Sequence, residues 1–273
     1  MICISLEVIY KMIENIWRYR QFIYSMVKRD FQSKYRGSVL GIFWMIFQPL
    51  ALIAVYTIVF SEIMKSKLAG METLPYAYSI YLCVGVLTWG LFTELTMNSI
   101  NVFFNNANLM KKISFPRICL PVITMLTALL NFSIGFSLFL IFLVVMGMFH
   151  LKMFLLFFGV LAVQLIFSLS LGVGLGVLNV FFRDVGQLFN VVLQFWFWYT
   201  PVVYPANIIP QSFQWLINLN PMYHIVHAYQ NLFVYNIMPD VYGLGGVLVL
   251  SLLLALWALH LYRGHVGELV DEL

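Results

Sequence analysis

Hydrophobic positions along this chain gather in long segments that no charged residue interrupts. These segments cover residues 39–60, 118–151, 153–182, 185–239 and 241–262. About 20 consecutive apolar residues cross the hydrocarbon core of a bilayer as a helix. A helix satisfies its own backbone hydrogen bonds in hydrocarbon, whereas a membrane barrel needs short alternating segments that this chain lacks. The pattern therefore predicts an all-α, polytopic membrane protein.

Six transmembrane helices are expected, followed by a tail at 263–273. Twelve of the 15 Lys and Arg residues lie in the segment before the first span, in the loops after the second and fourth spans, or in the tail. With six crossings, all of these segments lie on the same side of the membrane. Because basic residues mark the cytoplasmic side, both termini are predicted to be cytoplasmic, in a single transmembrane domain, 1–273. The six predicted spans are 39–60, 76–97, 118–148, 153–181, 185–205 and 241–262.

The N-terminal arm, 11–36, has apolar residues at helical spacing, among them Ile16, Ile23 and Val27, with polar residues opposite. This pattern is typical of a helix lying in the cytoplasmic membrane interface. A soluble helix packed on a partner would show the same stripe, so that alternative stays open.

The uncharged stretch from 185 to 239 is too long for one crossing. Prolines divide it, and its second half mixes polar and apolar positions. We therefore expect residues 207–239 to form short helices that re-enter the membrane from outside, which is tolerable where backbone is buried in protein or lines a water path. An ordinary external loop is the alternative, disfavoured by the many apolar residues.

Composition excludes a soluble domain, because 62% of the residues are hydrophobic and 10% are charged, against about 25% charged in soluble proteins. The net charge of +4 is explained by topology and does not indicate nucleic-acid binding. Three scattered cysteines indicate neither a disulfide framework nor a thiolate metal site. We expect no metal and no cofactor.

The spans carry little chemistry of their own. Few ionisable groups lie in the spans or the re-entrant region, among them Glu94, His224 and His227, too few for an ion-coupled transporter or for the paired carboxylates of an intramembrane glycolipid enzyme. The two histidines are read as structural or interfacial. No catalytic residue is predicted, so the chain is interpreted as a translocation subunit that takes its energy from a partner, with the enzyme as the alternative class.

Three glycines alternate in the fourth predicted span without the Lys and Ser or Thr of a P-loop. They are Gly172, Gly174 and Gly176. Small residues at such spacing permit close helix packing, which is the role we assign to them.

Ordered short motifs along nearly the whole chain resemble ATP-binding-cassette transporter permeases of the polysaccharide-export family, and most closely those that export O-antigen. Teichoic-acid and capsule permeases share fewer of them, and a permease for a drug or other small amphiphile is a further alternative. The motifs lie at residues 28–30, 34–41, 44, 48–49, 111–117, 120–121, 181–185, 199–201 and 220–222.

The resemblance implies a homodimer of six-helix subunits in the bacterial cytoplasmic membrane, joined to two copies of a separate ATPase. Its cargo would be a lipid-linked polysaccharide, with O-antigen the first candidate. In this family the loop after the second span forms a coupling helix that docks on the ATPase. The matching residues here are Asn106, Asn108, Leu109, Met110, Lys111 and Lys112, although a basic loop that only fixes topology would look the same.

Aromatic residues are dense near the end of the fifth predicted span and beyond it. Aromatic rings can stack on sugar faces along a polymer path or gate, but they also form belts at headgroup depth. Only some members of a consecutive run can face a path. The candidates are Trp196, Trp198, Tyr199, Trp215 and Tyr223.

Glu94 lies near the cytoplasmic end of the second predicted span, and Arg183 and Asp184 lie at the start of the fifth. An acid near the membrane is costly unless it is hydrated or paired. We therefore predict one polar network of these three residues on the cytoplasmic side, the alternative being that each is simply solvated.

Overall fold

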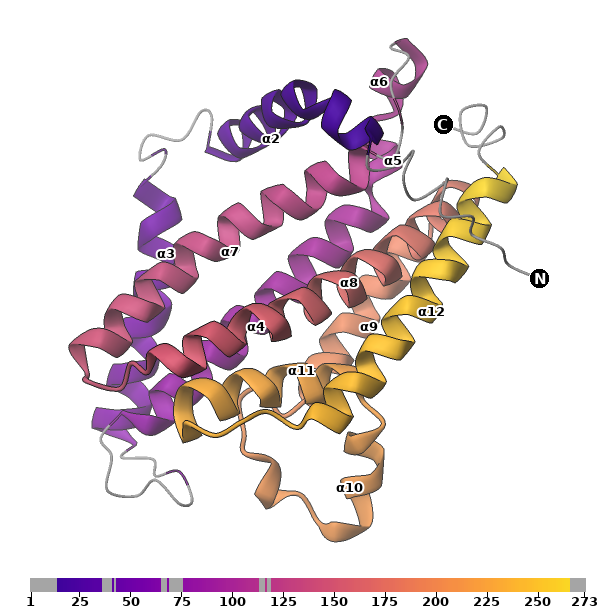
Figure 1. Cartoon of the computed structure of the whole chain (residues 1–273). Helices are drawn as coiled ribbons and strands as arrows, with labels where there is room; N and C mark the ends of the chain where they lie inside the picture. Colours follow the sequence, from indigo (N-terminus) through magenta and orange to yellow (C-terminus); the bar gives the residue numbers. More distant parts are fainter. Residues whose placement is uncertain are drawn as a thin grey trace.

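The computed structural model describes residues 14–35, 41, 43–64, 68, 76–112, 116 and 119–265, and every regular element among them is helical. Long helices lie side by side, with short helices at both ends (Figure 1). The elements are α2 (Arg20–Tyr35), α3 (Phe43–Tyr56), η1 (Thr57–Ile63), α4 (Ala77–Ile100), α5 (Val102–Asn105), α6 (Ala107–Lys112), α7 (Cys119–Val145), α8 (Leu151–Phe181), α9 (Val185–Tyr199), η2 (Ala206–Ile208), α10 (Gln211–Asn218), α11 (Pro221–Gln230), η3 (Asn231–Tyr235) and α12 (Val241–His265).

Five helices within the described residues are long and apolar enough to cross a membrane. Their bounds agree with the predicted spans to within a few residues. The chain is therefore a polytopic helical membrane protein. The five are Phe43–Ser61, Ala77–Ile100, Cys119–Val145, Leu151–Phe181 and Val241–Gly264.

The helix found in the predicted crossing at 185–205 is shorter than expected. Helix α9 ends at Tyr199 after 15 residues, which corresponds to about 22 Å of helix against a hydrocarbon core of about 30 Å. The following residues, 200–205, are not helical. Pro201 explains the end of the helix, because a residue before proline avoids helical angles and Thr200 has an extended backbone.

Helix α4 occupies the middle of the bundle and α8 packs closely against it. The alternating glycines make this approach possible: a Cβ at Gly172 would lie 2.6 Å from the Ser99 Cβ, and one at Gly176 would lie 2.7 Å from the Ser99 carbonyl oxygen. On the other side of α8, Gly174 faces the ring of Trp257 on α12. The packing role predicted for these glycines is confirmed.

The apolar stripe of the N-terminal arm is divided between two environments. Ile23, Met26 and Val27 of α2 are buried, and α2 packs along α7. Trp17 and Tyr24 remain 71% and 70% exposed. One side of the helix thus packs on the bundle of its own chain, while the two large rings face outward.

The segment predicted to re-enter the membrane is a series of short helices, of which α11 and η3 are largely buried. Ile225, Val226 and Tyr229 are at most 1% exposed, and α11 packs against α4, α8 and α12. Pro221 occupies the first turn of α11, where its missing N–H costs nothing. Helix α10 differs, because Trp215 is 61% exposed.

Replacing Gly172 or Gly176 by alanine should lower the thermal stability of the purified chain. The added methyl group would force α4 away from α8, and overpacking of this kind costs about 1–3 kcal/mol. Gly159→Ala is the matched control, because it lies on the same helix with nothing within 4 Å of its Cβ position. Thermal unfolding in detergent measures the difference; equal midpoints for all three variants would contradict close packing at this seam.

Candidate functional site

One end of the bundle carries α2, α5 and α6 (Figure 1). Met110 of α6 is 8% exposed and belongs to an apolar cluster with residues of α2, α5, α7 and α8. We call this set the α6 cluster. It contains Ile23, Met26, Val27, Val102, Phe103, Met110, Cys119, Leu120, Ile123, Val177 and Val180.

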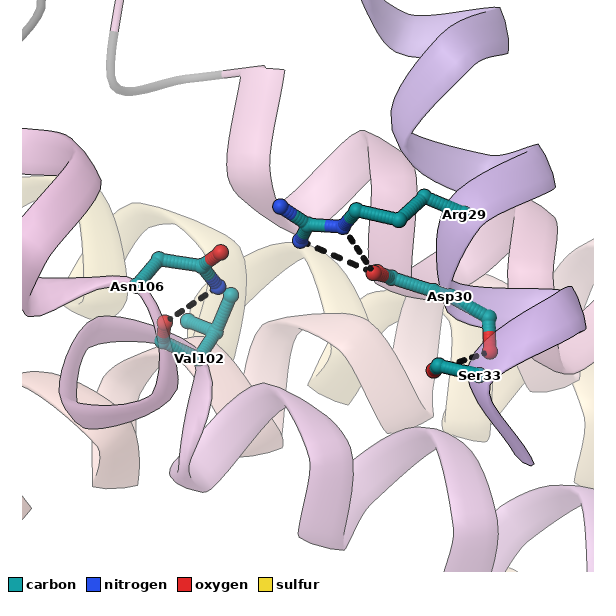
Figure 2. A network of polar contacts seen from close by, with 5 residues as sticks. All are labelled: Arg29, Asp30, Ser33, Val102 and Asn106. Atoms are coloured by element: carbon teal, nitrogen blue, oxygen red, sulfur yellow. Dashed lines mark hydrogen bonds and ion pairs between the residues drawn. The ribbon is translucent and has the colours of Figure 1, made fainter. Parts of the chain in front are cut away.

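The predicted coupling residues divide between this cluster and the surface. Met110 is buried, Leu109 is half-buried and Lys111 is exposed. The Asn106 side chain donates a hydrogen bond from Nδ2 to the Val102 carbonyl oxygen at 2.9 Å, which closes the turn between α5 and α6 (Figure 2). The side chains of Asn108 and Lys112 lie outside the described residues. Helix α6 is thus anchored by Met110 and presents Lys111 to solvent.

The neighbouring part of α2 carries a surface ion pair. Arg29 contacts the Asp30 carboxylate at 2.9 Å, and the Ser33 hydroxyl donates to the Asp30 carbonyl oxygen at 2.9 Å (Figure 2). Both charged side chains are at least one-third exposed, so the pair adds little to stability. Both members lie within the sequence motif at residues 28–30.

Glu94 is directed toward α7. Its Oε1 accepts a hydrogen bond from Asn131 Nδ2 at 2.6 Å, and both residues line a groove of about 450 Å³ between α3, α4 and α7. Arg183 and Asp184 are exposed at the turn between α8 and α9. The structure therefore joins Glu94 to Asn131, a partner that the sequence reading missed, and the network with Arg183 and Asp184 stays a prediction.

The turn at Arg183 and Asp184 is held by a buried asparagine. Asn179 Oδ1 accepts a hydrogen bond from the Gly186 backbone N–H at 2.8 Å. Because Asn179 is an isolated polar residue at the end of an apolar helix, no periodic signal in the sequence identified it as the link between α8 and α9.

The opposite end of the bundle carries the aromatic candidates, and they fall into two groups. Trp198, Tyr199 and Trp215 are 66%, 39% and 61% exposed. Tyr199 donates a hydrogen bond from its hydroxyl to the Leu216 carbonyl oxygen, which ties α9 to α10. We call these three residues the outer aromatic surface.

Trp196 and Tyr223 contribute to packing instead. The Trp196 ring lies edge-on to Phe92 at 5.3 Å, and its Nε1 donates to Asn220 Oδ1 at 2.8 Å. The Tyr223 ring stacks on His227 at 5.2 Å. Whether any of these aromatic residues faces a path stays a prediction.

Asn220 is the residue that fastens α9 to α11. It is 2% exposed, its Oδ1 also accepts from the Met222 backbone N–H at 3.0 Å, and its Nδ2 donates to Thr200 Oγ1 at 2.9 Å. The Asn220 side chain therefore caps α11 and also accepts a hydrogen bond from the indole N–H of Trp196. The sequence marked Asn220 only as part of a motif.

The non-helical backbone after α9 obtains its hydrogen bonds from tyrosines of α4. The Tyr81 hydroxyl donates to the carbonyl oxygens of Pro201 and Tyr204 at 3.2 and 2.9 Å, and the Tyr78 hydroxyl donates to that of Val203 at 3.0 Å. Carbonyl groups that no helix satisfies are thereby paired inside the protein, which is what a low-dielectric environment requires.

The two histidines of α11 both have protein partners. A ring nitrogen of His224 lies 2.8 Å from the Asn218 carbonyl oxygen, and His227 Nδ1 lies 3.3 Å from Asn231 Nδ2. Across the described ranges, no group of three or more potential metal ligands occurs.

Residues 21–234 match the family model of the ABC-2 type transporter. The chain belongs to the ABC-2 type transporter family. It is accordingly a membrane permease subunit of an ATP-binding-cassette transporter and not an enzyme, and family membership implies a partner ATPase subunit.

Relatives of this ABC-2 permease cover most of its length. The O-antigen export system permease protein RfbA of Myxococcus xanthus is 29% identical over 250 residues, 91% of this chain and 93% of that protein. Two proteins of the same name from Klebsiella pneumoniae are 27% identical, one over 84% of this chain and 86% of its own length, the other over 82% and 84%.

Replacing Asn220 by alanine should destabilise the ABC-2 permease by about 2 kcal/mol or more, because two buried donors lose their acceptor. Trp196→Phe removes one of these donors. If the two residues are coupled through the hydrogen bond, the double variant should lose less stability than the two single losses added together. Thermal unfolding gives the values, with Asn207→Ala on the exposed helix η2 as the control. Strict additivity would contradict the coupling.

Proposed function

We propose that this ABC-2 permease is the membrane-spanning subunit of an ATP-driven exporter of a lipid-linked polysaccharide, with O-antigen the first candidate. The observation that carries the proposal is the similarity to O-antigen export permeases over 91% of the chain. The outer aromatic surface supports it, since exposed rings offer flat apolar faces to sugars.

The proposed topology has six crossings with both termini in the cytoplasm of a bacterium. The fifth crossing would consist of α9 together with residues 200–205. The hydrogen bonds from Tyr78 and Tyr81 support this, because they make that non-helical backbone tolerable at membrane depth. Helix α11 would re-enter from outside, covered by α4, α8 and α12.

The proposed assembly is a homodimer with two ATPase subunits. We place the dimer contact at α3 and α9, whose exposed apolar side chains include Phe47, Leu50, Val192 and Phe195. The α6 helix would dock on the ATPase through its exposed face, and its link to the bundle through Met110 would carry the movement inward.

Charge reversal at Lys111 tests the coupling helix. The chain alone should hydrolyse no ATP, and Lys111→Glu should lower transport by the complex with its ATPase about tenfold, equal to about 1.4 kcal/mol of lost docking free energy. Lys152→Glu is the control, because Lys152 is exposed at the start of α8, away from α6. Equal transport by both variants, or ATP hydrolysis by the isolated chain, would contradict the proposal.

Transport into vesicles tests the cargo. The complex should move lipid-linked O-polysaccharide, and Trp198→Ala or Trp215→Ala should each slow it about fivefold, since an aromatic contact contributes about 1 kcal/mol. Tyr242→Ala is the control, because Tyr242 is 93% exposed at the start of α12. If the lipid carrier without its glycan crossed equally fast and the tryptophan variants had no effect, the cargo would be a small amphiphile instead.

A further inference from the structure

A groove of about 570 Å³ runs between α2 and the first half of α7, a volume within the usual range of ligand sites, about 300–1,000 Å³. Its floor is apolar, formed by Ile23 and Val27 of α2 with Leu126 and Leu130 of α7. The two α7 leucines are 36% and 45% exposed. The groove is therefore long, apolar and open along one side.

The charged residues that line this groove are both basic. Arg20 and Lys28 line it, eight residues apart on α2 and both exposed. The guanidinium group of Arg20 lies 5.3 Å from the centre of the Trp17 ring and donates to the Trp17 carbonyl oxygen at 3.2 Å. Arg20 is thereby held at the groove, so less side-chain entropy is lost when it binds a ligand.

The rim of the groove has the chemistry of a membrane interface. Trp17 and Tyr24 line it, and both rings are exposed. Exposed Trp and Tyr side chains are typical of headgroup depth. An apolar floor, an aromatic rim and two positive charges together match an amphiphile with an acyl chain and a negatively charged headgroup.

We infer that the groove between α2 and α7 is a binding site for an anionic phospholipid of the surrounding membrane, with an acyl chain along α7, the headgroup phosphate at Arg20, and Lys28 adding positive charge further along α2. Arginine presents a fork of donors that suits phosphate oxygens, and basic residues at a membrane surface attract anionic lipids. This groove lies at the opposite end of the bundle from the outer aromatic surface (Figure 1). Because α2 also belongs to the α6 cluster, a bound lipid would hold α2 in place beside the coupling helix.

Binding of dioleoylphosphatidylglycerol to the purified full chain in detergent tests the site, by native mass spectrometry and by the rise in thermal unfolding temperature that a ligand of the folded state causes. Arg20→Gln with Lys28→Gln should weaken binding about 30-fold, the change that corresponds to about 1 kcal/mol per basic residue. Arg18→Gln is the matched control, because Arg18 is exposed on the same arm but does not line the groove. Dioleoylphosphatidylcholine should bind weakly to every variant.

A second variant distinguishes lipid binding in the groove from attraction by the surface charge alone. Leu126→Trp keeps every charge and fills the apolar floor, so it should also abolish tight binding. The inference is overturned if Leu126→Trp binds the anionic lipid like the unchanged chain, if Arg18→Gln weakens binding as much as the double variant, or if both lipids bind equally. None of these measurements depends on transport, so the site and the proposed function are tested independently.

Discussion

The structure depends on one constraint: backbone polar groups inside a membrane need partners within the protein. Long helices meet it along most of the chain. Where α9 ends, the carbonyl oxygens of Pro201, Val203 and Tyr204 receive hydrogen bonds from Tyr78 and Tyr81, which lie on a helix more than 100 residues earlier. The position of α4 at the centre of the bundle is what allows this.

The central position of α4 depends in turn on small residues. Hydrophobic attraction is weak between helices in lipid, so close packing of their surfaces holds them together. Gly172 and Gly176 let α8 approach the α4 backbone, and buried polar bonds then fix the pair. Gln164 of α8 donates to the Thr88 carbonyl oxygen at 2.8 Å and accepts from the Tyr229 hydroxyl at 2.7 Å. A single amide thus joins α4, α8 and α11.

Hydropathy and helical period were sufficient to predict the five long helices, the N-terminal helix and the broken region after α9, because these features depend on local sequence. The partners of isolated polar residues were not predictable. Asn131 is hydrogen-bonded to Glu94, 37 residues away in the sequence, and Asn220 to Trp196, 24 residues away. Neither pairing produces a periodic pattern in the sequence. For the same reason, the aromatic run indicated that only some rings can face a path but did not identify Trp196 as a half-buried ring with a hydrogen-bond partner.

The distribution of contacts indicates which parts can move. Helix α11 is joined to α8 through Gln164 and to α9 through Asn220, so these three helices and α4 form one interlocked unit. Helix α3 is different: Ile53 is its one buried residue, whereas 16 residues of α4 are buried. Displacing α11 would break several buried hydrogen bonds, whereas displacing α3 would mainly exchange one apolar surface for another. We therefore expect conformational change in this permease to occur at α3 and, in the proposed homodimer, at the contacts between copies, with the unit of α4, α8, α9 and α11 moving as a whole.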